Sequence, residues 1–106
     1  MKKIIPALVL LAALPSMALA QPKIDQNCRY KGIVLQGKVK EVSSGADIRI
    51  KRVNAFPDLK VELVKSFPDK CGKWQWVDSF PDFTVQFVDA FPELSVSFVT
   101  AFPGLP

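Results

Sequence analysis

The sequence contains no histidine, and this absence removes several familiar kinds of active site. A Ser-His-Asp triad, a Cys-His pair and a zinc site with imidazole ligands all need that side chain near neutral pH. A chain of 106 residues also has room for at most one small domain. The residues that remain form no recognisable reaction site, so we expect a protein that is not an enzyme.

The chain also lacks an apolar run long enough to cross a membrane, which needs about 20 residues. Its first 20 residues are Met1-Lys2-Lys3, an apolar run from Ile4 to Leu14, and a segment ending in Ala18-Leu19-Ala20. This pattern is typical of a secretory signal peptide, with small residues before the cleavage site. We therefore expect residues 1–20 to be removed after Sec-type export, which gives a periplasmic or secreted chain without a membrane contact.

Cysteine is scarce, and the two cysteines do not form the Cys-x-x-Cys motif of a redox-active thiol pair. In an oxidising compartment an even number of cysteines most simply means structural bridges. We expect one disulfide between Cys28 and Cys71.

Basic residues are missing from the last part of the chain. Residues 21–77 contain 12 basic and 6 acidic residues, whereas residues 78–106 contain 4 acidic and no basic ones. Such asymmetry can steer a charged partner or favour head-to-tail self-association. We expect a monomer or weak homodimer, and no nucleic-acid partner because the chain has an export signal and no sustained basic stripe.

What the sequence does have is an 11-residue repeat, clear from Ile48 onward. Each unit contains alternating apolar and polar residues, then a valine, a small residue, Phe and Pro. Residues 37–47 fit as a degenerate first unit without Phe-Pro, and residues 70–82 form a unit lengthened by two. Alternation with period two predicts strands with one buried face, and proline in each of the five clear units excludes a long helix. Periodicity alone therefore predicts an all-β domain such as a small β-solenoid or β-prism.

The Phe-Pro pairs are expected to be the corners between strands, because proline ends a strand and favours extended geometry in the residue before it. We expect the phenylalanines to pack into the core as corner anchors, since an exposed row of five would favour aggregation or partner binding. The corner residues are Phe56, Pro57, Phe67, Pro68, Phe80, Pro81, Phe91, Pro92, Phe102 and Pro103.

An acidic residue closes every unit except the last, which ends in Gly104, and these acids are the only ionisable groups that recur: Asp47, Asp58, Asp69, Asp82 and Glu93. The preferred interpretation is structural, because Asp in a turn readily accepts hydrogen bonds from backbone N–H groups. Two alternatives are a row of calcium ligands and the acid and base of a glycoside hydrolase. We expect no metal and no cofactor.

Two segments differ from the repeat. Residues 21–27 are polar and are expected to be a flexible arm before a domain that spans residues 28–106. Lys70–Trp76 carries the second cysteine and is expected to be the longest loop. Alternation through Trp74-Gln75-Trp76 places both indoles on the buried face.

The corner motif is Val-Asp-Ser-Phe-Pro-Asp at residues 77–82, and close versions occur at residues 64–69 and 88–93. Together with Lys-Cys-Gly-Lys-Trp-Gln at residues 70–75, it resembles the septoil-knot domain family over Cys28–Pro106. The resemblance implies a small all-β domain tied into a deep seven-crossing torus knot, with no established biochemical function. The first unit departs from the family pattern, because Ser44-Gly45-Ala46 replaces the small residue, Phe and Pro.

These observations favour an exported, non-enzymatic binding or structural module. Its partner would be an unknown protein or a component of the cell envelope. The alternatives are a small carboxylate-dependent hydrolase of envelope glycans and a calcium-binding repeat protein.

Overall fold

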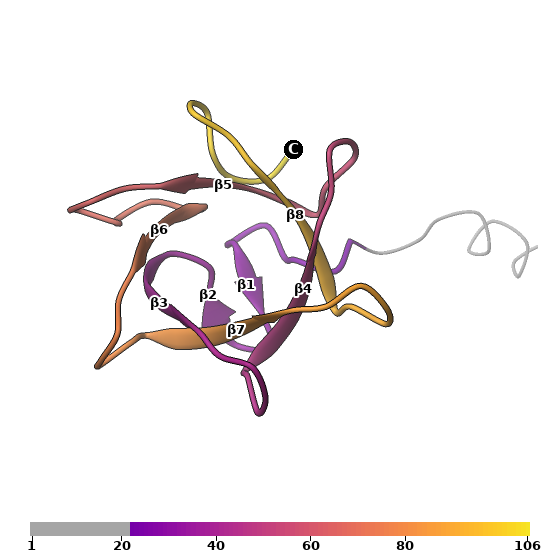
Figure 1. The fold of residues 1–106 in the computed structure, drawn as a ribbon. Helices are drawn as coiled ribbons and strands as arrows, with labels where there is room; N and C mark the ends of the chain where they lie inside the picture. The colour runs from indigo at the N-terminus through magenta and orange to yellow at the C-terminus, as the bar shows by residue number, and fades with distance from the viewer. Residues whose placement is uncertain (1–21) are drawn as a thin grey trace, which may run out of the picture.

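The computed structural model describes residues 22–106, in which all regular structure is β-strand. The expected signal peptide and its cleavage residues Ala18 and Ala20 lie outside the described residues. The strands are β1 (Arg29–Tyr30), β2 (Ile33–Val34), β3 (Gly37–Glu41), β4 (Ile48–Arg52), β5 (Leu59–Leu63), β6 (Lys73–Trp76), β7 (Phe83–Phe87) and β8 (Leu94–Phe98) (Figure 1). The all-β fold class is confirmed. Within residues 22–106 there is no helix with the length and apolar character needed to cross a membrane.

Six of these strands close into a barrel in the order β3-β6-β5-β8-β4-β7, and every pair is parallel. The strands are strongly staggered. In β4, Ile48–Ile50 pair with β7 and Ile50–Arg52 pair with β8. Because the sheet closes on itself, the barrel has no unpaired edge strand. The small β-solenoid or β-prism that periodicity suggested is therefore wrong.

The alternation along each strand fills the barrel interior. Inward-facing residues near the start and middle of the strands are almost completely buried, and the polar residues between them face outward. Ile48, Ile50, Leu59, Val61, Val85 and Val96 all have 0% exposure. Burial of each such side chain stabilises the fold by about 1.5–3 kcal/mol. Across residues 22–106 no polar or charged residue is buried.

Consecutive strands of the repeat mostly are not neighbours, because their connection passes over one intervening strand. The stagger makes this possible: the last residue of β7, Phe87, and the first of β8, Leu94, both pair with Ile50 of β4. The connection therefore has to cross β4 sideways and does not have to return along the length of the barrel.

Backbone hydrogen bonds hold both ends of the connection to the strand that it crosses. Between β7 and β8, the Val88 N–H donates to the Ile50 carbonyl and the Glu93 N–H donates to the Arg49 carbonyl, both at 2.8 Å. The same arrangement places residues 42–47 over β7, 53–58 over β8, 77–82 over β3 and 99–104 over β5. Of the described connections between barrel strands, only residues 64–72 join adjacent strands, β5 and β6.

All these steps run in the same direction around the barrel. As a result the chain circles the axis more than once, and later strands insert between earlier ones. β7 lies between β3 and β4, and β8 lies between β4 and β5. Units of similar sequence can build such a path because four of the five connections between barrel strands perform the same step.

The amino ends of the barrel strands are covered by the residues that precede β3. β1 and β2 form an antiparallel hairpin across this end (Figure 1). Ile24 and Leu35 join the core, with exposed fractions of 4% and 0%. The Asp25 carboxylate accepts hydrogen bonds from the Asn27 and Arg29 N–H groups. The expectation of a flexible arm is therefore corrected for residues 22–27, since the buried Ile24 fixes this segment.

The expected disulfide is confirmed, and it links the hairpin to the turn before β6. Cys28 and Cys71 are bonded, with their Cα atoms 5.9 Å apart. The expected long loop is wrong, because Lys73–Trp76 form β6 and leave only a short turn before it. Gly72 lies in that turn, where a Cβ atom would contact the backbone of Lys60 and Gly104. This close approach explains why the lengthened unit has glycine there.

We predict that the double variant Cys28→Ala/Cys71→Ala has a free energy of unfolding about 4 kcal/mol lower than the wild type. The bridge joins residues 43 apart in sequence, so its removal restores conformational entropy to the unfolded chain. Urea unfolding followed by tryptophan fluorescence measures the difference. The reduced wild type is the matched control and must unfold like the double variant; a loss below about 1 kcal/mol would contradict the prediction.

Candidate functional site

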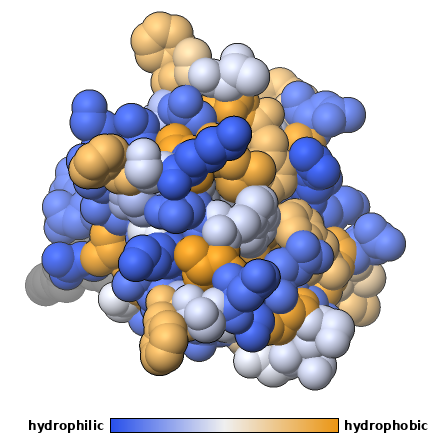
Figure 2. Space-filling view, turned by 60° about the vertical axis from the view of Figure 1, so that its left-hand side comes forward, coloured by the Kyte–Doolittle hydropathy of each residue, from blue (hydrophilic) through white to orange (hydrophobic). Residues whose placement is uncertain are grey.

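The phenylalanines of the five Phe-Pro corners stand outside the barrel. Their exposed fractions range from 79% at Phe67 to 97% at Phe56, whereas all five prolines are half-buried. In Figure 2 hydrophobic side chains likewise protrude at the margin of a largely hydrophilic surface. The expectation that Phe56, Phe67, Phe80, Phe91 and Phe102 are buried corner anchors is therefore wrong. At each corner the proline, and not the phenylalanine, is the more buried residue.

The backbone explains this placement. All five phenylalanines have φ between +52° and +57°, in the left-handed region, so the expected extended geometry is also wrong. The two ends of a crossover bond to neighbouring residues of the strand that it crosses, as residues 88–93 do at Ile50 and Arg49. The chain therefore has to turn back sharply between these ends, and the phenylalanine lies at the turn. This region normally favours glycine or asparagine, and a bulky residue there costs about 1–3 kcal/mol. We call the five Phe-bearing connections the spokes: residues 53–58, 64–69, 77–82, 88–93 and 99–104.

The acids that close the units fix the spokes to the barrel. The Asp82 carboxylate accepts a hydrogen bond from the Lys38 N–H at 2.8 Å, and the Asp82 N–H donates to the Lys38 carbonyl at 2.7 Å. Gly37 permits this contact, because a Cβ atom at that position would meet the Asp82 carboxylate. The acid thus acts as an extra rung of the ladder between β3 and β7.

The same two-point contact recurs in three other units. Asp58 binds Ser95, Glu93 binds Arg49, and Asp47 binds Thr84, where the hydroxyl serves as the acceptor of the Asp47 N–H. Asp69 makes no such bond within the described chain. The acids accept backbone N–H groups as expected, but from a strand far away in sequence and not from their own turn. Residues 22–106 contain no group of three acids or cysteines able to hold a metal ion.

Glu93 also ties the amino-terminal hairpin to the barrel. Its carboxylate accepts hydrogen bonds from Lys31 Nζ at 2.8 Å, the Arg49 N–H at 2.9 Å and the Tyr30 hydroxyl at 3.1 Å. The Lys31 hydrogen bond, helped by the Arg49 N–H and the Tyr30 hydroxyl, lowers the pKa of Glu93 to about 2, although burial alone would raise it. The same hydrogen bond raises the pKa of Lys31. The charged form of Glu93 is therefore the structural one.

The carboxyl ends of the barrel strands form the opposite, uncovered end. The last inward-facing residue of each strand lies here, and nothing in the described chain covers these residues as the hairpin covers the amino ends. They are Glu41, Arg52, Leu63, Trp76, Phe87 and Phe98, which we call the open-end cluster. Leu63 is 44% exposed and Trp76 is 37% exposed. The expectation that both indoles are buried thus holds for Trp74, at 1%, and is wrong for Trp76.

The aromatic rings of this cluster form a continuous row from the core to the surface. The Trp76 ring lies 6.2 Å from Trp74 and 6.3 Å from Phe87, and Phe87 lies 6.2 Å from Phe98. The Arg52 guanidinium stands over Phe98 at 4.6 Å, within the range of a cation–π contact. The open end therefore presents an aromatic surface with a fixed positive charge on its rim.

Several grooves lie around this cluster, between the ends of neighbouring strands. One groove of about 400 Å³ is lined by Leu63, Val64, Lys65, Gln75 and Trp76, and we call it the Lys65 groove. Others, of about 380 and 540 Å³, adjoin Phe98 and Phe87. The lining of each groove combines apolar and polar residues, as protein interfaces do.

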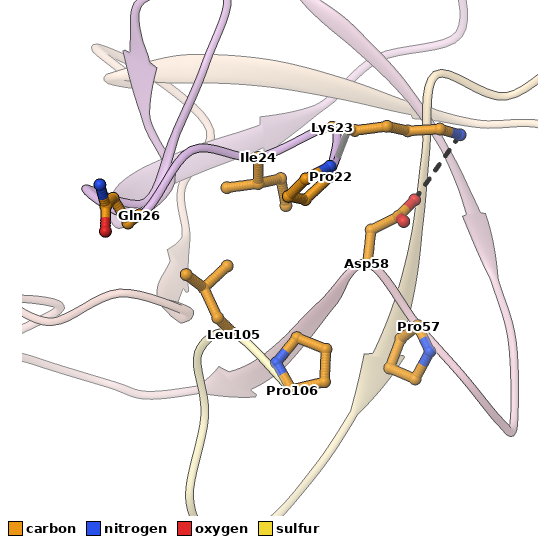
Figure 3. A pocket seen from close by; sticks show the side chains of 8 residues that line it. All are labelled: Pro22, Lys23, Ile24, Gln26, Pro57, Asp58, Leu105 and Pro106. Carbon is orange, nitrogen blue, oxygen red and sulfur yellow. Dashed lines mark ion pairs between the residues drawn. The ribbon is translucent and has the colours of Figure 1, made fainter. Parts of the chain in front are cut away.

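A further hollow of about 350 Å³ lies at the covered end, between the two ends of the described chain (Figure 3). Pro22, Ile24, Leu105 and Pro106 supply an apolar lining, and the Lys23–Asp58 ion pair of 3.8 Å crosses its rim. Since Asp58 is already bonded to Ser95, few polar groups remain for recognition. This hollow is a packing junction of the chain ends.

Alternation in the sequence predicts that Leu63, Trp76, Phe87 and Phe98 face inward, but it predicts neither the positions of Glu41 and Arg52 nor the meeting of these residues in the open-end cluster. Alternation predicts direction, yet the parallel arrangement that brings the six strand ends together depends on the crossovers. One signal was available: the last alternating apolar residue is aromatic at Trp76, Phe87 and Phe98, where a smaller core residue would suffice.

We predict that Glu93→Gln lowers the free energy of unfolding at pH 7 by about 2 kcal/mol, because charge-assisted hydrogen bonds are lost. The contribution of a carboxylate with a lowered pKa is fully present above its unfolded value, near 4.5, and is lost as pH falls through about 2. Thermal unfolding from pH 7 to pH 2 measures both effects. Glu41→Gln, at the exposed rim, is the control and should change stability little; equal losses would contradict the prediction.

We predict that Phe91→Asn leaves the free energy of unfolding unchanged or raises it by up to about 1 kcal/mol. Asparagine tolerates the left-handed backbone, and the ring, 85% exposed, contributes little packing. Urea unfolding at low protein concentration tests this. Phe83→Ala, which removes a ring only 3% exposed, is the contrasting control and should cost about 3–5 kcal/mol. A loss above about 1 kcal/mol for Phe91→Asn would show that the spoke ring supports the fold.

Comparison with known proteins agrees with this architecture. No curated protein matches the chain. The family model described as the 7(1) septoil knot domain matches residues 32–106, which include all six barrel strands and all five spokes. The chain therefore belongs to the septoil knot domain family.

Proposed function

We propose that the mature chain is an exported, non-enzymatic binding module of the periplasm or extracellular space, and that it binds its partner through the open end of the barrel. The Cys28–Cys71 disulfide indicates an oxidising compartment, and the signal-like first 20 residues supply a route to it. The partner is a protein or a component of the cell envelope.

One observation carries the proposal: residues 22–106 leave the aromatic row of the open-end cluster uncovered at one end of an otherwise closed barrel. Trp76 is partly exposed, and Arg52 is held against Phe98 at the rim. Tryptophan and arginine are the residues that most often dominate binding energy at interfaces, and the mouths of barrels are common binding sites. A rigid barrel also holds these side chains in place before binding, which lowers the entropic cost of association.

The recurring acids support a binding role better than a hydrolytic one. A general acid needs a raised pKa, whereas the pKa of Glu93 is lowered to about 2. The carboxylates of Asp47, Asp58 and Asp82 accept backbone N–H groups of neighbouring strands. These contacts engage the same oxygen atoms that a glycan hydrolase or a calcium site would use.

The proposal is tested by site-specific photocrosslinking in cells that export the protein. A photoreactive p-benzoylphenylalanine replaces Glu41 at the open end or, as the matched control, Gln26 at the covered end; both positions are exposed. We expect a reproducible crosslinked partner from position 41 and none from position 26. Adding Trp76→Ala should remove the crosslink at position 41, because the aromatic surface is lost.

The melting temperature of each purified variant checks that the fold is retained. Crosslinking at position 26 as strong as at position 41, or no crosslink at position 41, would contradict the open end as the binding surface.

A further inference from the structure

The spoke formed by residues 88–93 exposes an aromatic ring and a carboxylate that make no stabilising contact described within residues 22–106. Phe91 is 85% exposed and has a left-handed backbone, so it combines conformational strain with exposed apolar surface. Asp89, two residues earlier, is exposed, and within residues 22–106 it takes part in no ion pair. The apex Asp89–Phe91 is therefore an apolar knob with an unpaired negative charge beside it.

The five spokes differ at the position two residues before the phenylalanine. This position holds Asn54, Lys65, Asp78, Asp89 and Thr100. Of the two acidic spokes, the one with Asp78 lies against its own open end, where Asp78 lines a groove with Lys40 and Trp76. The Asp89 spoke is the acidic one whose apex lines none of the open-end grooves that the structure describes.

The Lys65 groove has the complementary chemistry. Its apolar residues, Leu63 and Trp76, are among the exposed large hydrophobic side chains of the molecule. Lys65 stands at its edge, exposed and outside the ion pairs found in residues 22–106. A groove with an apolar floor and a basic edge fits an aromatic ring with an acidic neighbour.

The knob and the groove lie on opposite sides of the barrel. The Phe91 spoke crosses β4, while the groove lies between the ends of β5 and β6, and β4 and β6 are three strands apart in either direction around the ring. In Figure 1 the connection from β7 to β8 projects on the right, with β5 and β6 on the upper left. A knob cannot reach the groove of its own chain, and the pair can serve two different neighbours at once.

We propose that the Asp89–Phe91 apex of one copy docks into the Lys65 groove of a second copy, so that the protein assembles head to tail. The inference rests on the proposed function, because it names a partner for the open end. Such a contact is heterologous and builds open chains, not closed two-fold dimers. It is small, and small interfaces bind weakly, so assembly depends on protein concentration. The exposed ion pair makes it sensitive to salt.

The test is sedimentation velocity of the mature chain, residues 21–106, from micromolar to millimolar concentration. We expect the wild type to form oligomers that grow with concentration, and Phe91→Asn or Trp76→Ala to need at least tenfold higher concentration. Phe102→Asn is the matched control, since that ring is 86% exposed but has the uncharged Thr100 two residues before it, and this variant should associate like the wild type.

Mixing the two defective variants tests the pairing itself. Phe91→Asn retains a groove and lacks a knob, whereas Trp76→Ala retains a knob and lacks a complete groove. Their equimolar mixture should form heterodimers that do not grow further. Asp89→Lys and Lys65→Glu should each weaken assembly, and the chain carrying both changes should recover it. These charge variants keep the test valid if Trp76→Ala fails to fold.

Three results would overturn the inference: a wild type that stays monomeric at millimolar concentration, a Phe102→Asn defect equal to that of Phe91→Asn, or a variant mixture that stays monomeric. A monomeric wild type whose position 41 still crosslinks another molecule would reject self-assembly and leave the proposed function standing. Self-assembly through the knob and groove, with position 41 crosslinking only a second copy, would support both.

Discussion

The whole architecture depends on one kind of pairing, in which a single residue of the crossed strand pairs with the last residue of one strand and with the first residue of the next strand in the chain. Ile50 of β4 pairs with both Phe87 and Leu94, and the bonds at Val88 and Glu93 fix the connection between them. Parallel strands ordinarily need a connection of about a dozen residues or more, because the chain must return along the strand. Here the stagger removes that return, and residues 88–93 suffice. Short units of similar sequence can then wind more than once around one barrel.

The acidic residues at the ends of the crossovers hold them to the strands that they cross. The end of the crossover at residues 77–82 lies beside the start of the strand that it crosses, and there Asp82 accepts a hydrogen bond from the Lys38 N–H of β3. Glu93 does the same for Arg49 and reaches Lys31 of the hairpin as well. One set of acids thus holds the crossovers and closes the amino end. Among residues 22–106 nothing covers the opposite end in this way, and this difference leaves Leu63 and Trp76 partly exposed.

Local sequence patterns predict much of this fold. Alternation located the strands, the even cysteine count gave the disulfide, and the corner motifs pointed to the family. The misassigned residues share a cause: their environment is set by strand order and stagger, which period-two alternation does not encode. Phe91 is apolar and was therefore expected inside, but the crossover places it at the reversal. Trp76 was correctly assigned to the inner face, but its exposure depends on where the barrel ends. Asp82 was expected to bond its own turn, whereas its partner is 44 residues away.

The repeat itself shows which of these features the fold requires. A residue at the apex with φ near +55° is best filled by glycine or asparagine if stability alone decides. The neighbouring exposed position varies freely among the units, from Asn54 to Lys65 to Asp89, yet phenylalanine occupies the apex in all five spokes. The first unit demonstrates that the barrel tolerates the alternative, because Gly45, with φ of +69°, turns the same kind of crossover without a ring. Since this crossover forms without phenylalanine, the reversal itself does not require the exposed rings, which supports the contact between copies proposed for the Phe91 spoke.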